Sequence, residues 1–120
     1  MLVVFLGEKR MAVDFAAGAY SVAPYFDTYI SAPAHASVSG KLMLADMAPK
    51  MRHDLLGNAP YEARTKHTIV SKMKLDAELK RVSHQGYATN FNENVVGICA
   101  IGARLNTPSG RAWRDRANRA

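Results

Sequence analysis

The feature that most constrains this 120-residue chain is an amphipathic helix that runs directly into strands. Three apolar residues recur at the i, i+4 and i+7 spacing of one helix face: Leu75, Leu79 and Val82. Ser71 is suited to cap the start of this helix, and Gly86 stands where a left-handed residue commonly ends one. Together with the extended segments around it, this helix predicts an α+β domain.

The segment after Gly86 reads as two strands, Tyr87–Asn90 and Val95–Leu105, joined by an asparagine-rich loop. Residues 97–103, GICAIGA, are all small or apolar. A strand of small residues leaves room for a ligand against the sheet, and a polar loop at its mouth supplies the few oriented hydrogen bonds that give specificity. Small residues equally permit close helix packing, so the pattern leaves both interpretations open.

The N-terminal third of the chain is expected to be extended. Leu2–Leu6 and Met11–Ala17 predict a hairpin across a polar turn. Residues 18–34 mix aromatic residues with two prolines, which favours an edge strand or a loop.

Two shorter helices are expected before the long one. Ser37 or Ser39 can cap a helix that runs to Met47, and Pro49 is expected to end it. A weaker helix follows over Met51–Leu56. These elements predict helices packed against a largely antiparallel sheet.

The composition limits which cellular compartment and which classes of binding partner are expected. No apolar run approaches the roughly 20 residues of a membrane span, so no membrane partner is expected. The single cysteine excludes an internal disulfide, argues against a structural zinc site and fits a reducing cytoplasm, and no cofactor is implied. The formal net charge is +6, and residues 111–120 contribute +3 of it through four Arg and one Asp. The other charges are dispersed, so charge alone does not indicate nucleic-acid binding.

The residue patterns favour binding over catalysis. Ser37 and Ser39 lie near His35, but the G-x-S-x-G elbow and an evident orienting acid are missing. Cys99 sits in an apolar strand, where a cysteine is expected to be a buried small hydrophobe. Four acidic residues form no defensible spaced carboxylate pair: Glu62, Asp76, Glu78 and Glu93. The capped helix start is a natural place for an anion, and an enzyme that uses Cys99 or His35 is the weakest alternative.

Two stretches resemble one known family. HASVSGKLMLADM, residues 35–47, resembles the H-A-[ST]-x-x-G-K-x-x-L-A segment of the IclR family of bacterial transcriptional regulators. Thr68-Ile69 and residues 75–105 resemble that family's later segment, in which a helix, a Gly-Tyr pair, a polar acidic loop and a small-residue strand follow in order. The resemblance implies the family's C-terminal effector-binding domain, an α+β domain with a GAF/profilin-like fold.

The same resemblance implies a function. Family regulators join an N-terminal winged helix-turn-helix to this effector domain, and they act as homodimers or homotetramers that repress or activate catabolic operons. Their effectors are small organic or aromatic acids. The chain covers most of the effector domain and none of the DNA-binding part. The implied role is therefore ligand sensing without enzyme activity, with DNA bound only through a missing N-terminal domain.

The resemblance also places candidate effector-binding residues on this chain. Val38 and Ser39 would offer backbone amides to the ligand. Asn90 stands where the family's polar loop has its first acid, so it keeps hydrogen-bonding ability without the charge. Ala100 stands where the family often has a ligand-contacting cysteine, while Cys99 takes the neighbouring position that faces the opposite way.

Two apolar wall positions complete the expected site. Ile98 matches one of them, and Ala32, before the first motif, matches the other. Because the usual acid and cysteine are both replaced, a larger or less polar effector fits this set at least as well as a small acid.

The end of the chain departs from the family. After Gly110 the family continues with a strand whose serines line the pocket and with a last helix, whereas this chain reads RAWRDRANRA. Residues 1–110 are therefore interpreted as a partial effector-binding domain without its C-terminal strand and helix, and residues 111–120 as a basic tail foreign to the family. The competing hypothesis is a structural or dimerisation module, or a degenerate fragment, that has no ligand pocket.

Overall fold

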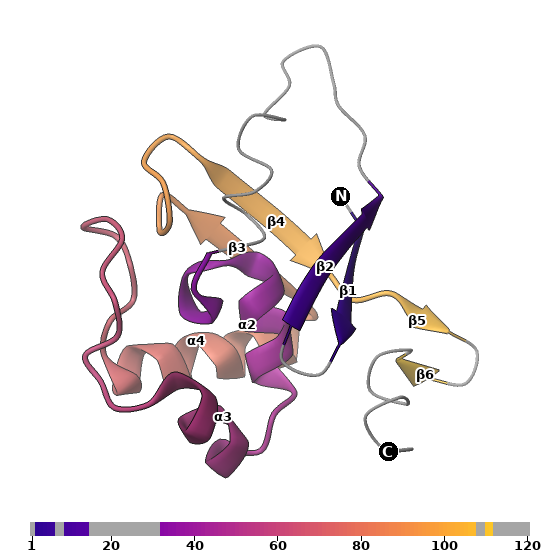
Figure 1. Cartoon of the computed structure of the whole chain (residues 1–120), viewed down its shortest axis with the longest axis horizontal. Coiled ribbons are helices and arrows are strands. Elements are labelled where there is room, and N and C mark those ends of the chain that lie inside the picture. The colour runs from indigo at the N-terminus through magenta and orange to yellow at the C-terminus, as the bar shows by residue number, and fades with distance from the viewer. Residues whose placement is uncertain (1, 7–8, 15–31, 108–109, 112–120) are drawn as a thin grey trace. The chain divides into compact units, whose positions relative to one another are not determined.

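The computed structural model describes residues 2–6, 9–14, 32–107 and 110–111 (Figure 1). The chain divides into two compact units, named here by their place in the sequence. Residues 32–103 form the inner unit, and the segments before and after them in the sequence form the outer unit. Most of the expected extended segment 18–34 and nearly all of the C-terminal tail lie outside the described residues.

The outer unit contains two short antiparallel pairs. β1 (Leu2–Leu6) pairs with β2 (Lys9–Asp14), with a register irregularity between Leu2 and Val3. This confirms the predicted hairpin, although its second strand begins two residues earlier than expected. β5 (Asn106–Thr107) pairs with β6 (Gly110–Arg111), so these strands flank the turn expected at Thr107–Gly110.

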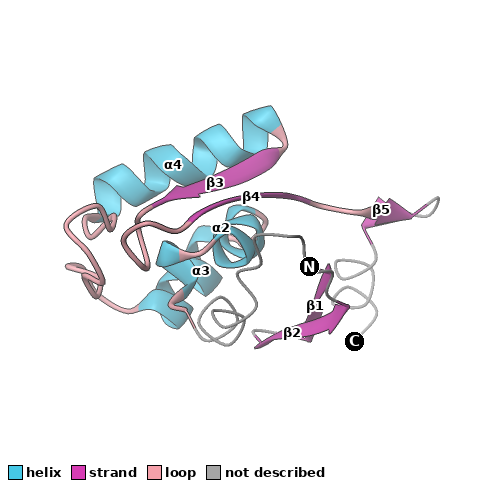
Figure 2. Cartoon of the chain, turned by 90° about the horizontal axis from the view of Figure 1, so that it is seen from above, coloured by secondary structure: helices cyan, strands magenta, loops and turns pink. Residues whose placement is uncertain are grey.

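The inner unit contains the predicted helices and the second hairpin. Its elements in chain order are the 3-10 helix η2 (Ala34–Ala36), α2 (Val38–Ala45), α3 (Pro49–Leu56), α4 (Lys72–Gln85), β3 (Tyr87–Phe91) and β4 (Cys99–Ala103). α2 packs against α4 and against the β3–β4 hairpin, and α4 runs alongside β3 (Figure 2). Helices against an antiparallel pair of strands confirm the α+β class.

Capping groups place the start of α2 and both ends of α4 where the sequence predicts them, whereas α2 ends at Ala45, two residues before the expected Met47. The Ser37 hydroxyl accepts a hydrogen bond from the Gly40 N–H at 3.1 Å, which makes Ser37 the cap of α2. Ser71 caps α4 in the same way, and Gly86 ends α4 with a left-handed φ of 85°. Pro49 behaves differently from the expectation. It is the first residue of α3. At this position an N–H would have no partner within the helix, and the fixed φ of proline suits a helix.

The core of the inner unit lies where α2 and α4 meet. Leu75 and Leu79 of α4 are buried with Leu44 of α2, and Val82 is buried with Leu42 and Ala88. This confirms the predicted apolar face of α4. Removing these side chains from water is the main favourable contribution to the stability of the unit.

The β4 strand of the hairpin has one face that is partly covered and one that is open to solvent. Asn90 pairs with Ala100 and Ala88 pairs with Gly102, and these residues are buried or half-buried. The alternate residues of β4 are exposed, among them Ile101 and Cys99. The expectation of a buried Cys99 is therefore wrong, because side chains alternate along a strand and this residue falls on the open face. The expected opposite orientation of Cys99 and Ala100 is confirmed.

The second strand of this hairpin is shorter than expected. Residues 95–98 belong to the connecting loop, and β4 begins only at Cys99. Asn92 and Gly97 have left-handed φ values of 62° and 90°, and the Gly97 N–H donates to the Asn92 side-chain oxygen at 2.7 Å. Asparagine and glycine tolerate this conformation, so the loop turns here instead of extending the strand.

Candidate functional site

The first turn of α2 lies against the covered face of β4. Val38 and Ser39 are the first two residues of the helix and are half-buried. A Cβ atom built on Gly102 would lie 2.5 Å from Val38 Cγ1, so any larger residue would require the Val38 side chain or the helix to move. The small-residue strand therefore does bring a helix close, as one of the two open interpretations of its composition expects.

The Asn90 side chain links β3 to the segment just before α2 through a hydrogen bond. Its side-chain N–H₂ donates to the Ala36 carbonyl at 2.7 Å, and its side-chain oxygen accepts the Glu93 N–H at 3.0 Å. Asn90 is buried, so both bonds replace contacts that water would otherwise make. The residue lies beside the first turn of α2, as expected for the site, and both polar atoms of its amide are engaged within the chain.

This geometry separates the effects of the same substitution at Asn90 of β3 and at Asn92 of the loop that follows. Asn90→Asp removes the donor to the Ala36 carbonyl and places a negative charge against that oxygen, so we expect a loss of about 1–3 kcal/mol in the free energy of unfolding. Asn92→Asp is the matched control, because its oxygen can still accept the Gly97 N–H. Urea denaturation followed by circular dichroism compares them, and an equal effect of the two changes would contradict the assigned role of Asn90.

The remaining predicted residues lie on β4, in the loop before β4 and ahead of η2. Ala100 is the cross-strand partner of Asn90 and lies on the same covered face. Ile98 is half-buried in the loop just before β4, where its N–H donates to the Val95 carbonyl at 3.1 Å. Ala32 is buried ahead of η2. The structure thus gathers Val38, Asn90 and Ala100 around the start of α2, with Ser39 beside Val38 on the same turn.

A buried lysine that the sequence patterns did not indicate lies behind this site. Lys41 of α2 is fully buried, and its Nζ donates to Glu78 Oε2 and to the Thr89 carbonyl, each at 2.8 Å. Nζ also lies 2.8 Å from Glu93 Oε1, an ion pair whose geometry falls short of a directed hydrogen bond. Arg81 pairs with the other oxygen of Glu78. Two positive and two negative side chains thus balance in one cluster, the Lys41 cluster.

The Lys41 cluster brings together two acidic residues that the sequence patterns did not connect. Glu78 and Glu93 were expected to form no spaced carboxylate pair, and the structure places each of them against the same ammonium. They lie on α4 and on the loop after β3, so only the tertiary fold brings them together. Removing any one charged side chain from such a buried cluster leaves an uncompensated charge, which destabilises the fold.

The loop after β3 is tied down by backbone as well as side-chain groups. The Thr68 hydroxyl donates to the Glu93 carbonyl at 2.6 Å, and the Thr65 hydroxyl donates to the Asn92 carbonyl at 2.5 Å. The Phe91 N–H donates to Glu93 Oε2 at 3.2 Å. The asparagine-rich loop is therefore held by the 65–68 segment, by α2 and by its own side chains.

Electrostatics within the Lys41 cluster shift the acid strength of one member. Burial raises the pKa of the Glu78 carboxyl, but hydrogen bonds from Lys41 and Arg81 and the positive charges of both outweigh burial and hold that pKa below its ordinary value. A carboxyl whose pKa is lower in the folded state contributes stability above the pKa of the unfolded state. That contribution is lost as the pH falls through the folded pKa.

We therefore expect the chain to lose stability as the pH is lowered below about 4.3, the ordinary pKa of a glutamate. Glu78→Gln should flatten this part of the dependence, because a neutral side chain releases no proton there. Glu62→Gln is the control, since Glu62 is mostly exposed and lies 3.5 Å from Arg64. Thermal midpoints measured between neutral and acidic pH test this, and a slope in Glu78→Gln as steep as in the wild type would count against it.

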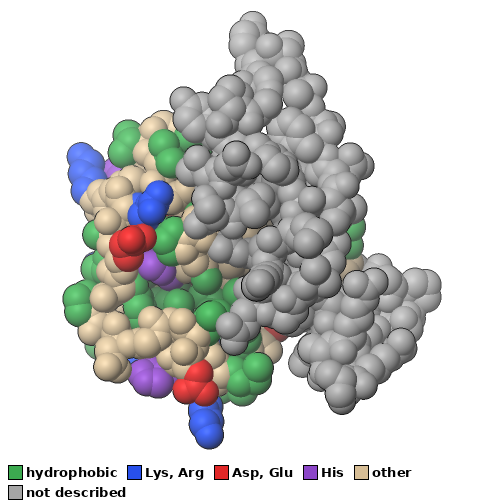
Figure 3. Space-filling model, viewed as in Figure 1, with side chains coloured by type: hydrophobic (Ala, Val, Ile, Leu, Met, Phe, Trp, Pro, Cys, Tyr) green, Lys and Arg blue, Asp and Glu red, His purple; other side chains and the backbone are tan. Residues whose placement is uncertain are grey.

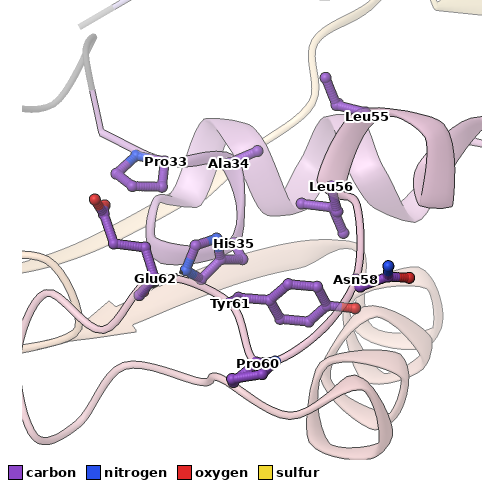
Figure 4. Close-up of a pocket in the computed structure, with 9 residues that line it drawn as sticks. All are labelled: Pro33, Ala34, His35, Leu55, Leu56, Asn58, Pro60, Tyr61 and Glu62. Atoms are coloured by element: carbon purple, nitrogen blue, oxygen red, sulfur yellow. Dashed lines mark hydrogen bonds between the residues drawn. The ribbon is translucent and has the colours of Figure 1, made fainter.

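A separate hollow of about 340 Å³ lies between η2 and the segment after α3 (Figure 4). Its lining residues are Pro33, Ala34, His35, Leu55, Leu56, Asn58, Pro60, Tyr61 and Glu62. His35 is buried as expected, and its Nε2 lies 2.7 Å from the Glu62 carbonyl, which only accepts, so Nε2 carries the proton. The His35 and Tyr61 rings lie side by side with their centres 5.5 Å apart. None of the six predicted effector-binding residues lines this hollow.

The described surface carries no concentrated charge on the face shown in Figure 3, where Lys, Arg, Asp and Glu side chains are scattered. Within the described residues no three His, Cys, Asp or Glu side chains are grouped so that they could hold a metal ion. No helix in the described part of the chain is long and apolar enough to cross a membrane.

Comparison with known proteins assigns the family. The sequence model for the C-terminal domain of the bacterial transcriptional regulator IclR matches residues 25–111. The chain therefore belongs to the IclR family of transcriptional regulators, and the matched residues correspond to the family's C-terminal domain. Both motifs that carry the resemblance, residues 35–47 and 68–105, lie inside this range.

Individual relatives agree with this assignment. A probable transcriptional regulator, SauR from Cupriavidus necator, is 32% identical over 80 residues, which are 67% of this chain and 32% of SauR. The repressor BlcR from Agobacterium tumefaciens is 28% identical with a TM-score of 0.59, over 67% of this chain and 32% of BlcR. The chain thus spans about a third of the length of each.

A third solved structure shares the fold at lower identity. It is the inducer-binding domain of a PobR double mutant from Acinetobacter, in complex with 3-hydroxybenzoic acid. It has a TM-score of 0.64 and 20% identity, and it covers 90% of this chain and 65% of that chain. The likeness confirms the expected GAF-like α+β fold of the family's C-terminal domain.

Proposed function

We propose that this chain is the effector-sensing part of a bacterial transcriptional regulator. A small organic or aromatic acid would bind between the first turn of α2 and the β3–β4 hairpin. Its binding would change DNA binding by a winged helix-turn-helix that lies outside these residues. In this role the chain binds a ligand without catalysing a reaction, and it works in the cytoplasm as part of a homodimer or homotetramer.

The observation that carries this proposal is the convergence of three elements at one place. The N-terminal turn of α2 presents backbone N–H groups, which favour an anionic group. Asn90 supplies a side-chain amide beside that turn, and Ala100 supplies a small side chain on the same face. Val38, Ser39 and Asn90 would bind the polar end of the effector, and Ala100, Ile98 and Ala32 would form the apolar wall.

Calorimetry with a panel of organic and aromatic acids, 3-hydroxybenzoate among them, tests the proposal. Ala100→Leu fills the covered face of β4, while Ala103→Leu adds the same side chain to the open face of the same strand. We expect a compound that binds the wild type to bind Ala103→Leu equally and Ala100→Leu about tenfold more weakly or not at all. Circular dichroism confirms that each protein is folded. A folded wild type that binds no compound would contradict effector sensing.

A structural or dimerisation module without a pocket is the second candidate. Both polar atoms of the Asn90 amide are engaged, by Ala36 and Glu93, and Val38 packs onto Gly102, which favours a filled interior at this place. In that case the folded wild type would bind no acid of the panel, while it would still self-associate. Calorimetry therefore distinguishes the two candidates, and sedimentation of the wild type over a range of concentrations tests the self-association that both expect.

A further inference from the structure

Lys41 reaches both sides of the proposed effector site from one position. Its backbone lies in α2, three residues after Val38, and its side chain extends to β3 and to the loop after it. The Thr89 carbonyl and the Glu93 carboxylate flank Asn90 along the chain, and each lies 2.8 Å from Lys41 Nζ. The segment that carries the Asn90 amide is thus held at both ends by one residue of the helix it faces.

Glu93 is the main attachment of this loop. Its N–H donates to Asn90, its carbonyl accepts from Thr68, and its carboxylate contacts Lys41 and the Phe91 N–H. A buried carboxylate that lost its ammonium would lower its free energy by moving into water. Because the Glu93 backbone is bonded to the Asn90 side chain, such a movement would also displace that amide from the Ala36 carbonyl.

From these contacts we infer that Lys41 is a positioning residue of the effector site. Acting through Glu93, it sets the distance between the Asn90 amide and the first turn of α2. The inference takes its functional meaning from the proposed effector site, because it describes how that site is held. Glu78 is the second carboxylate on the same ammonium, and it belongs to α4. Its carboxylate accepts from Lys41 of α2 and from Arg81 of α4, so it fastens Lys41 to α4.

Glu93→Gln and Glu78→Gln form a matched pair for the test, because each neutralises one of the two carboxylates on Lys41 and preserves the shape of the side chain. Amide hydrogen exchange of the full chain reports on the loop without any ligand. In Glu93→Gln we expect the backbone amide at position 93 to exchange about tenfold faster, while the Leu75 amide of α4 changes only as much as overall stability requires. In Glu78→Gln the loop and helix amides should change together.

The result that would overturn the inference is equal acceleration of loop and helix amides in Glu93→Gln, since that pattern means support of overall stability alone. A second measurement uses 3-hydroxybenzoate as the probe. If it binds the wild type, Glu93→Gln should weaken its affinity more than Glu78→Gln does, and the reverse order would also overturn the inference. If neither it nor any other acid binds, the proposed function fails, and the exchange pattern still decides whether Lys41 positions the loop.

Discussion

Lys41→Met is expected to cost about 3–5 kcal/mol in the free energy of unfolding, because it leaves two buried carboxylates without their ammonium. Methionine has a similar length and prefers the interior, so the change removes the charge while largely preserving volume. Whole domains are stable by only about 5–15 kcal/mol, so a large part of the stability would disappear. Urea denaturation followed by circular dichroism measures the loss.

The control for this prediction is the same substitution at an exposed ion pair. Lys72 Nζ lies 2.6 Å from Asp76 Oδ2 one turn along α4, and the side chains of the pair are 66% and 42% exposed. Surface pairs of this kind contribute about 0.3–0.5 kcal/mol, so Lys72→Met should barely change the denaturation midpoint. If the two variants had similar midpoints, Lys41 would not be the buried centre of a charged cluster.

Gly40→Ala is the second substitution with a large expected effect. A Cβ atom on Gly40 would lie 2.2 Å from the Ala34 carbonyl oxygen and 2.4 Å from Ala34 Cα. These are backbone atoms of η2 and cannot rotate away, so η2 and α2 would have to separate. We expect a cost at or above the upper end of the roughly 1–3 kcal/mol typical of overpacking, measured again by urea denaturation.

Gly86→Ala is the matched control for the glycine prediction. No atom lies within 4 Å of its Cβ position, and the only penalty is a left-handed φ of 85°. That penalty is about 1 kcal/mol for an alanine. Gly40→Ala should therefore be clearly the more destabilising change. If the two were equal, close packing of η2 on α2 would not be the reason for a glycine at position 40.

Features encoded by neighbouring residues could be predicted from the sequence. The cap at Ser71, the apolar face of α4 and the left-handed Gly86 all depend on residues within a few positions of one another. The hairpin at the N-terminus and the paired strands after α4 follow from equally local patterns. Family motifs then extended this to the class of domain and to the general place of the candidate site.

Features that depend on distant contacts could not be predicted in the same way. Lys41 and Glu78 are 37 positions apart, and no periodicity indicates that both point to the same buried place. Cys99 looked buried because its neighbours in sequence are apolar, whereas its exposure is decided by which face of the hairpin α2 covers. The engagement of the Asn90 amide by Ala36 is also invisible in sequence, since it joins residues 54 positions apart.

The contact between Val38 and Gly102 has a consequence for how the hairpin forms. A slip of β4 by one residue against β3 would turn every side chain to the other face and bring Ile101 toward α2. A methyl group in place of Gly102 would already lie 2.5 Å from Val38 Cγ1, so the larger side chain of Ile101 would push α2 away from the strand. Packing of α2 against β4 therefore favours the register that places Ala100 opposite Asn90.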